Sequence, residues 1–215
     1  PNIFSADSRF TMVSVDFSGN LIDGFEGEED GTYKGVKVNT LTLAANPRLT
    51  KYPTALAKSN STVEYVILRA CNVDEIPAGS FTYDNSIFLQ SLDLSYNNLT
   101  DLPREFHAGN MPYFYGLDLS FNNFSEFPYE KGERCLREWP TGIYQHTGLR
   151  GLYLGSNDLR KIDDTISTLC YYLDISDNPN IVFDASDICY AWQVGAYILR
   201  SDKWQNTTNC DPMLA

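Results

Sequence analysis

The residues with the clearest catalytic potential are a cysteine and a histidine in one segment, Cys135 and His146. A thiolate activated by an imidazole is the nucleophile of several hydrolase classes. Such a site also needs a group that orients the histidine and an oxyanion hole, and no recognisable motif supplies either. The five cysteines and two histidines show no C-x-x-C or paired-histidine spacing of a zinc site. We therefore expect no catalysis, no metal site and no cofactor.

Acidic chemistry is the second possibility, because four aspartates recur at one position of a repeated phrase: Asp16, Asp93, Asp118 and Asp174. A calcium site needs six to eight oxygens that converge on one ion. A glycosidase needs two carboxylates about 5–10 Å apart across a cleft. A row of single carboxylates on separate strands does neither, so a structural or solubility role is expected, with a basic partner as the functional alternative.

The aspartates lie in segments that follow a repeated frame, L-x-x-L-x-L-x-x-N-x-L. The frame is clearest at 89–99, 114–124 and 149–159. In its L-x-L segment, alternate side chains point to opposite faces of a short strand. One strand cannot bury its apolar face alone, so recurring frames stack into a parallel sheet. The sequence predicts an α/β solenoid in which seven strands form one continuous parallel sheet over residues 12–183.

The position after each strand predicts a ladder between successive turns. An asparagine side chain both donates and accepts hydrogen bonds, so it can bridge backbone groups of neighbouring turns. A cysteine can take this place because its thiol is a weak donor and packs well. The predicted ladder residues are Asn20, Asn46, Cys71, Asn97, Asn122, Asn157 and Asn178. Two turns are lengthened by one residue, at Asn46-Pro47 and Asn178-Pro179, and further prolines predict irregular or short-helical convex returns.

With these seven frames, the chain resembles the leucine-rich-repeat superfamily. The resemblance covers residues 12–183, and the variable repeat lengths and the N-P-x-L variant are most similar to bacterial surface-protein arrays of the Bacteroidetes type. The resemblance implies a right-handed superhelix with the sheet on its concave face, a face that commonly binds proteins or other ligands.

The predicted domain organisation has three parts beside the repeats. Residues 1–11 are expected to be a tail that partly caps the first repeat, and 184–215 a C-terminal cap. An insertion near 129–147 is either a local cover or part of a binding edge. A disulfide between Cys189 and Cys210 is predicted, because they lie outside the frame at the chain end and an exported protein would oxidise them. We expect an extracellular or cell-surface location, with signal and anchor outside this chain.

Charge and hydropathy limit the partners. The chain has 28 acidic and 16 basic residues, a net charge of −12. Nucleic acids and anionic membranes both favour Lys/Arg patches, so neither is an expected partner. No apolar run approaches the roughly 18 residues of a membrane-spanning helix.

The candidate binding residues are aromatic and arginine side chains at outward positions of repeats three to seven. They are Tyr65, Arg69, Tyr96, Phe121, Arg150, Tyr153 and Tyr172. Exposed tyrosine and arginine dominate protein interfaces, but solenoid strands also use tyrosine for packing against neighbours, and both interpretations stay open. The predicted function is a monomeric, non-enzymatic module that binds a protein ligand through the concave face. The alternative is glycan binding, because aromatic rings also stack on sugars.

Overall fold

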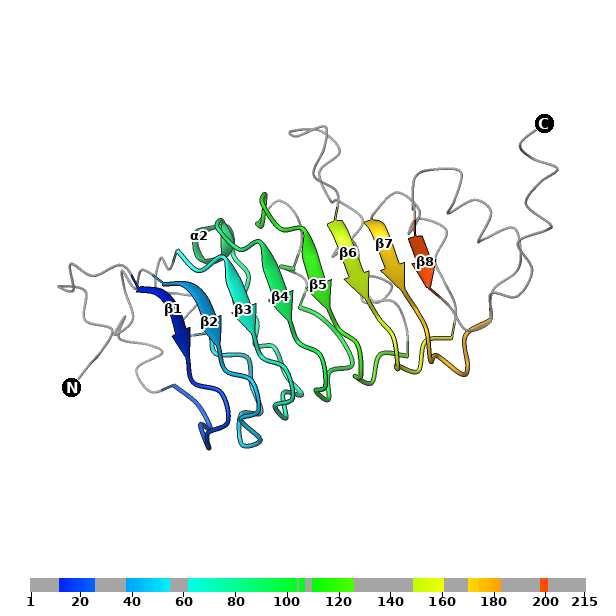
Figure 1. Ribbon diagram of the computed structural model, residues 1–215, viewed down its shortest axis with the longest axis horizontal. Coiled ribbons are helices and arrows are strands. Elements are labelled where there is room, and N and C mark those ends of the chain that lie inside the picture. The colour runs from blue at the N-terminus through cyan, green and yellow to red at the C-terminus, as the bar shows by residue number, and fades with distance from the viewer. Residues whose placement is uncertain are drawn as a thin grey trace.

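The computed structural model describes residues 12–25, 38–54, 62–103, 105–106, 110–125, 149–160, 170–182 and 198–200. They form one open sheet of eight parallel strands that follow one another in sequence order (Figure 1). The strands are β1 Met12–Asp16, β2 Val38–Thr42, β3 Tyr65–Ile67, β4 Ser91–Asp93, β5 Gly116–Asp118, β6 Leu149–Tyr153, β7 Cys170–Asp174 and β8 Ile198–Arg200. The predicted solenoid with one continuous parallel sheet is confirmed, and β1 to β7 coincide with the seven frames.

The sheet has one strand more than the sequence predicts. Strand β8 pairs in parallel with β7, with Tyr172 beside Ile198 and Asp174 beside Arg200. It lies in the segment 184–215, where no leucine frame is recognisable. A parallel strand joins a sheet edge through backbone hydrogen bonds, so the frame is not required for pairing. The tail 1–11, the insertion 129–147, and Cys189 and Cys210 lie outside the described residues.

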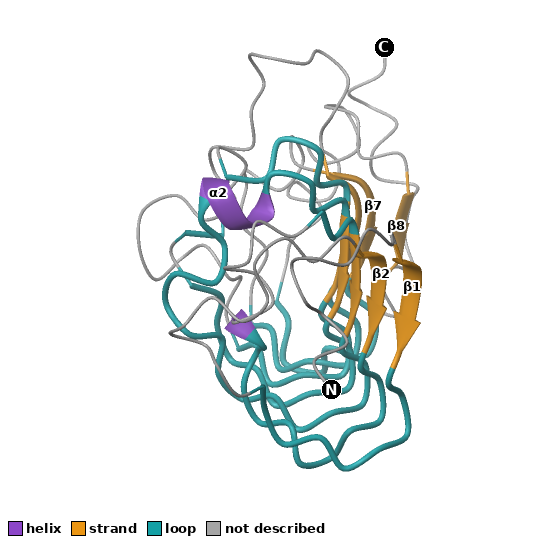
Figure 2. Cartoon of the chain, turned by 90° about the vertical axis from the view of Figure 1, so that its left-hand side faces the viewer, coloured by secondary structure: helices purple, strands orange, loops and turns teal. Residues whose placement is uncertain are grey.

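Frame residues fill the space between the sheet and the convex returns, which Figure 2 shows as two opposite sides of a coil. Leu92 and Leu94 of the fourth repeat are fully buried. One of the described returns contains the short helix α2, Tyr83–Ser86. Next to it, Phe81 and Phe106 pack edge to face, with ring centroids 4.8 Å apart. Burial of such leucine and phenylalanine side chains is the main stabilising contribution, about 1.5–3 kcal/mol each.

Asparagine side chains join each turn to the one before it. In Asn97, Nδ2 donates to the carbonyl oxygens of Leu68 and Leu94, both at 2.9 Å. Its Oδ1 accepts from the backbone N–H of Val73 at 2.9 Å. The same arrangement occurs at Asn46, Asn122, Asn157 and Asn178. These bonds satisfy buried backbone groups that the strands leave unpaired.

Cys71 replaces asparagine for a reason that lies in the preceding turn. Its thiol donates to the carbonyl oxygen of Leu43 at 3.2 Å. In other turns the apolar residue after the ladder position donates its N–H to the next asparagine. In the lengthened second turn the corresponding N–H, that of Leu49, already donates to the carbonyl oxygen of Asn46 at 3.0 Å. That N–H is thus not left for an asparagine oxygen at position 71. A thiol, which donates a hydrogen bond and is only a weak acceptor, therefore suits this position.

The residue before each ladder position has a left-handed backbone. The positive φ angles lie between 53° and 68° at Gly19, Ala45, Ala70, Tyr96, Phe121, Ser156 and Asp177. A left-handed non-glycine residue costs roughly 1–2 kcal/mol. The conformation is held by lateral hydrogen bonds, such as Tyr96 N to Ser120 O and Phe121 N to Gly155 O, both 2.9 Å. The repeat thus imposes the turn, whatever side chain stands there.

Candidate functional site

The outward positions of the strands form two rows, and we call these rows, together with the left-handed residues and their neighbours at the strand ends, the strand face. Parallel register places these residues side by side across the sheet. The first row is Ser14, Thr40, Tyr65, Ser91, Gly116, Gly151 and Tyr172, and the second is Asp16, Thr42, Ile67, Asp93, Asp118, Tyr153 and Asp174. The second row therefore mixes carboxylates with one large ring.

Each of the four aspartates closes the turn at the end of its own strand. One oxygen, Oδ1, accepts from both the backbone N–H and the hydroxyl of the serine two residues later, at 2.5 to 3.0 Å. This local pairing is the Asx-turn chemistry that explains the recurrent L-D-L-S phrase. The carboxylates are thus spaced one per strand and engaged locally.

The pKa shifts in opposite directions at two equivalent aspartates, one in the first repeat and one in the middle of the array. Hydrogen bonds from the Ser18 hydroxyl and N–H lower the pKa of the exposed Asp16. Burial raises the pKa of Asp118, and the nearby Asp93 adds to that rise. Hydrogen bonds from Ser120 and the charge of Arg69 oppose it. Asp118 is therefore a partly buried carboxyl group that lies within the field of Arg69.

Three of the predicted binding residues form a continuous stack, which we call the edge stack: Arg69, Tyr96 and Phe121. The Tyr96 and Phe121 rings lie 4.0 Å apart at 11°, and the Arg69 guanidinium carbon lies 4.7 Å from the Tyr96 centroid. Tyr96 is 40% and Phe121 44% exposed. Their left-handed backbone aims both rings outward at the strand ends. These are the only two large side chains among the seven left-handed positions named above.

Tyr153 and Tyr172 form a second group, the tyrosine pair, with ring centroids 5.1 Å apart at 38°. The Tyr153 ring lies across its own strand above Gly151, where a Cβ atom would stand 3.0 Å from the ring. A side chain at 151 would thus require the Tyr153 ring to shift slightly. Burial raises the pKa of Tyr153, and the nearby Tyr172, Asp118 and Asp174 add to the rise.

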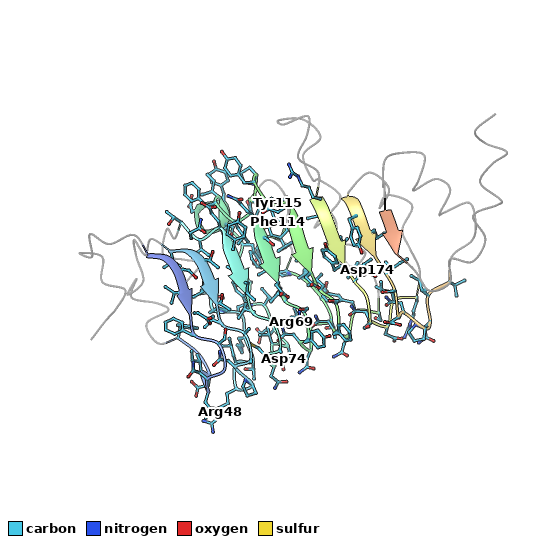
Figure 3. All side chains as sticks on the ribbon, viewed as in Figure 1. Arg48, Arg69, Asp74, Phe114, Tyr115 and Asp174 are labelled. Atoms are coloured by element: carbon cyan, nitrogen blue, oxygen red, sulfur yellow. The ribbon has the colours of Figure 1, made fainter. Side chains whose placement is uncertain are left out.

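The remaining two predicted residues lie in a third group at the strand starts. The Tyr65 hydroxyl donates to Gln90 Oε1 at 3.0 Å, and the Tyr115 hydroxyl donates to Tyr65 at 3.4 Å. The Arg150 guanidinium lies 5.7 Å from the Tyr115 centroid. The hydrogen bond with Tyr115 is the largest cause that raises the pKa of Tyr65. Figure 3 shows Tyr115 near the strand starts and Arg69 near the strand ends.

The seven residues therefore form three groups rather than one patch. The sequence analysis did not select Gln90 and Tyr115, although both hydrogen-bond to Tyr65. The signal available was their place directly before the strands of consecutive repeats. Of the alternative chemistries, Cys135 and His146 lie outside the described residues. Within those residues no group of three or more His, Cys, Asp or Glu side chains is placed to hold a metal ion. None of the helices in the described part has the length and apolar character to cross a membrane.

The comparisons with known proteins agree with this geometry. The Leucine Rich Repeat family model matches residues 88–108. A leucine-rich repeat protein from Bacteroides eggerthii is similar with a TM-score of 0.66 and 36% identity, over 99% of this chain and 39% of that one. One from Bacteroides thetaiotaomicron is similar with a TM-score of 0.61 and 36% identity, over 95% of this chain and 27% of that one. The chain thus spans well under half the length of either.

More distant similarity concerns the fold alone. The ectodomain of the Arabidopsis thaliana receptor kinase GASSHO1/SCHENGEN3, solved in complex with CASPARIAN STRIP INTEGRITY FACTOR 2, has a TM-score of 0.57 at 16% identity. It matches 91% of this chain and 24% of that chain. No protein in the comparison with curated proteins matches the sequence.

Proposed function

The chain belongs to the leucine-rich-repeat superfamily and resembles the leucine-rich repeat proteins of Bacteroides, and on that premise we propose that it is a non-enzymatic module that binds a protein ligand through its strand face. The fold is typical of protein-interaction modules, and the plant receptor of the same fold has a bound partner in its structure. The proposed module works as a monomer outside the cell or on its surface.

The observation that carries the proposal is the exposure of large rings at positions where the fold does not need them. Tyr96, Phe121 and Tyr153 are 40%, 44% and 38% exposed. Tyr96 and Phe121 also occupy left-handed positions that small residues fill elsewhere in the array. Aromatic and arginine anchors of this kind provide most of the binding energy of protein interfaces. Stable interfaces bury about 800 Å² on each partner, and the proposed interface accordingly spans several repeats.

Glycan binding is the alternative that one observation favours. The tyrosine pair lies beside Asp118 and Asp174, both of which influence the pKa of Tyr153. An aromatic ring with carboxylate acceptors nearby is also suited to sugar hydroxyls and their apolar faces.

Site-specific photo-cross-linking tests the proposal. A photoreactive residue is placed at Tyr153 or Phe121, and at Val182, which is 75% exposed outside the strand face, as the matched control. Each variant is irradiated on an array of extracellular proteins and, in parallel, incubated with a glycan array. Protein capture at Tyr153 and Phe121 but not at Val182 is expected. Capture that is equal at Val182 contradicts the strand-face proposal, and glycan binding that is lost in Tyr153→Ala favours the alternative.

Thiol counting tests the proposed extracellular setting. The proposal includes the Cys189–Cys210 disulfide, which would stabilise the chain end by up to a few kcal/mol in the chain-entropy model. Cys71 has a free thiol, partly buried, with a pKa that burial raises. Denatured protein that exposes five free thiols would contradict the disulfide.

A further inference from the structure

The two ends of the edge stack differ. At one end the Arg69 guanidinium covers Tyr96, with 4.7 Å between its central carbon and the ring centroid. At the other end, within the described residues, Phe121 has its ring contact with Tyr96 on one face, and 44% of Phe121 is exposed. The stack therefore offers the outer face of the Phe121 ring to a ligand.

The next two left-handed positions define what lies beyond that ring. Backbone bonds from Phe121 to Gly155 and from Ser156 to Ser176, at 2.9 and 2.8 Å, place Ser156 one turn and Asp177 two turns further along. Successive turns are about 4.8 Å apart. Among the described residues, the small Ser156 side chain thus leaves about the width of one planar group beside Phe121. The Ser156 hydroxyl donates to Asp177 Oδ2 at 3.3 Å, so the exposed carboxylate leans toward this space.

An aromatic face followed by a carboxylate is the environment of a guanidinium. The arginine head group is planar, stacks on rings and pairs with carboxylates through its fork of N–H donors. The chain itself shows this chemistry at the opposite end, where Arg69 lies on Tyr96 and its charge acts on Asp118. Lysine lacks the planar head group, and a neutral ring would not pair with Asp177.

We infer that an arginine side chain of the protein ligand binds at this end of the stack, with its guanidinium on the outer face of Phe121 and paired with Asp177. The inference rests on the proposed function, because it specifies the chemistry of the partner's anchor. The net charge of −12 complements a basic partner and speeds its association at low salt.

An NMR titration of the full chain with N-acetyl-arginine amide tests the inference. The backbone signals of Phe121, Ser156 and Asp177 are expected to shift saturably, with a dissociation constant on the order of 10 mM, since one stacked ion pair provides little affinity. N-acetyl-citrulline amide, which is uncharged and nearly isosteric, serves as the control and should produce no saturable shift. N-acetyl-lysine amide should bind at least about twofold more weakly.

Variants assign the shifts to the site. Phe121→Leu and Asp177→Asn should each weaken arginine binding about twofold to fivefold, the usual range for exposed cation–π and ion pairs. Ser156→Arg should abolish it, because the chain then supplies its own guanidinium, whereas Ser156→Met adds length without charge and should bind better than Ser156→Arg. Thr42→Ala, on the second repeat, should change nothing.

Equal binding of the arginine and citrulline probes, or unchanged arginine binding in both Asp177→Asn and Ser156→Arg, would overturn the inference. If Phe121→Leu does not fold, Asp177→Asn and Ser156→Arg decide whether the inference holds. Cross-linking of a protein at Phe121 without arginine binding leaves the proposed function standing and rejects only the arginine anchor. Cross-linking elsewhere with no signal at Phe121 or Tyr153 rejects both.

Discussion

Repeats one and two share their backbone with repeats three to seven but present a different surface. Both regions have a left-handed residue before the ladder position, and both contribute strands to one parallel sheet. The outward side chains of the second repeat are Thr40, Thr42 and Ala44, whereas the later repeats carry the edge stack and the tyrosine pair. Inward positions therefore keep the apolar pattern of the coil in both regions, whereas outward positions differ between them.

The burial and hydrogen bonds of a ladder asparagine also differ between the first repeat and the middle of the array. Asn20 is exposed, and within the described residues it donates to carbonyl oxygens of its own turn, those of Phe17 and Ser18, at 2.9 and 3.1 Å. Asn97 is buried and joins two turns. Position along the array, not residue identity, decides the contribution of a ladder residue.

Core truncation should give the largest difference between middle and end. Leu94→Ala is expected to lower the free energy of unfolding by about 2–5 kcal/mol, because Leu94 is fully buried. Val15→Ala, at an inward position of the first repeat that is only partly buried, should cost less. Denaturant midpoints measure both. Equal losses would mean that the first repeat is as fully enclosed as the fourth.

Truncation of outward side chains should weaken ligand binding in repeats three to seven but not in repeats one and two. Once a protein ligand is identified, Tyr153→Ala and Phe121→Ala should each weaken binding by about 2 kcal/mol or more. Both should leave the thermal midpoint nearly unchanged, because the rings lie outside the core. Thr42→Ala should have little effect on either quantity. Calorimetric titration checks this, and loss of binding in a variant of the 129–147 segment alone would contradict it.

Removal of a ladder asparagine should cost more stability in the middle of the array than in the first repeat. Asn97→Ala is expected to cost about 1–3 kcal/mol, because it leaves buried backbone groups unpaired. Asn20→Ala should cost under about 0.5 kcal/mol, the usual range for exposed positions. Chemical denaturation of the two variants tests the comparison, and a loss below about 0.5 kcal/mol for Asn97→Ala would argue against the ladder.

Restoring the repeat consensus at Cys71 should not stabilise the chain. In Cys71→Asn the new Oδ1 would lack its backbone donor, since the Leu49 N–H is already bonded to Asn46. The expected result is a loss of about 1 kcal/mol. A gain in the denaturant midpoint would show that the lengthened turn adjusts to the new side chain.

The smallest expected effect is the pH dependence of stability at Asp16 and Asp118. The raised pKa of Asp118 means that stability falls as pH rises from 3.8 through the raised value, since the folded chain binds the proton more tightly. The lowered pKa of Asp16 means that its contribution is present above 3.8 and is lost as pH falls through the lowered value. Unfolding curves of Asp118→Asn and Asp16→Asn across this range should change in opposite directions, and parallel curves would contradict the shifts.

The strands and the order of the sheet could be predicted from the sequence because hydrophobic periodicity is local. The left-handed positions could not, since only Gly19 among them is a glycine, and Tyr96 and Phe121 have no sequence sign of unusual backbone. Strand β8 could not be predicted either, because pairing at an edge depends on backbone groups that every residue has.

The outward position of the candidate residues was predictable from the sequence, but their arrangement was not. Outward position follows from alternation along a strand. Which rings meet depends on neighbours in other turns, as with Gly151, whose missing side chain admits the Tyr153 ring. The Tyr65 hydrogen bonds with Gln90 and Tyr115 likewise join residues that are far apart in the sequence.

The direction of the asparagine bonds has a consequence for how the chain is made. Asn46, Asn97, Asn122, Asn157 and Asn178 each bond to the turn that precedes them in the sequence. During synthesis from the N-terminus, a turn can thus bond to the turn that has already folded before it, without waiting for the next turn to fold. The solenoid can therefore grow in step with translation, one turn at a time.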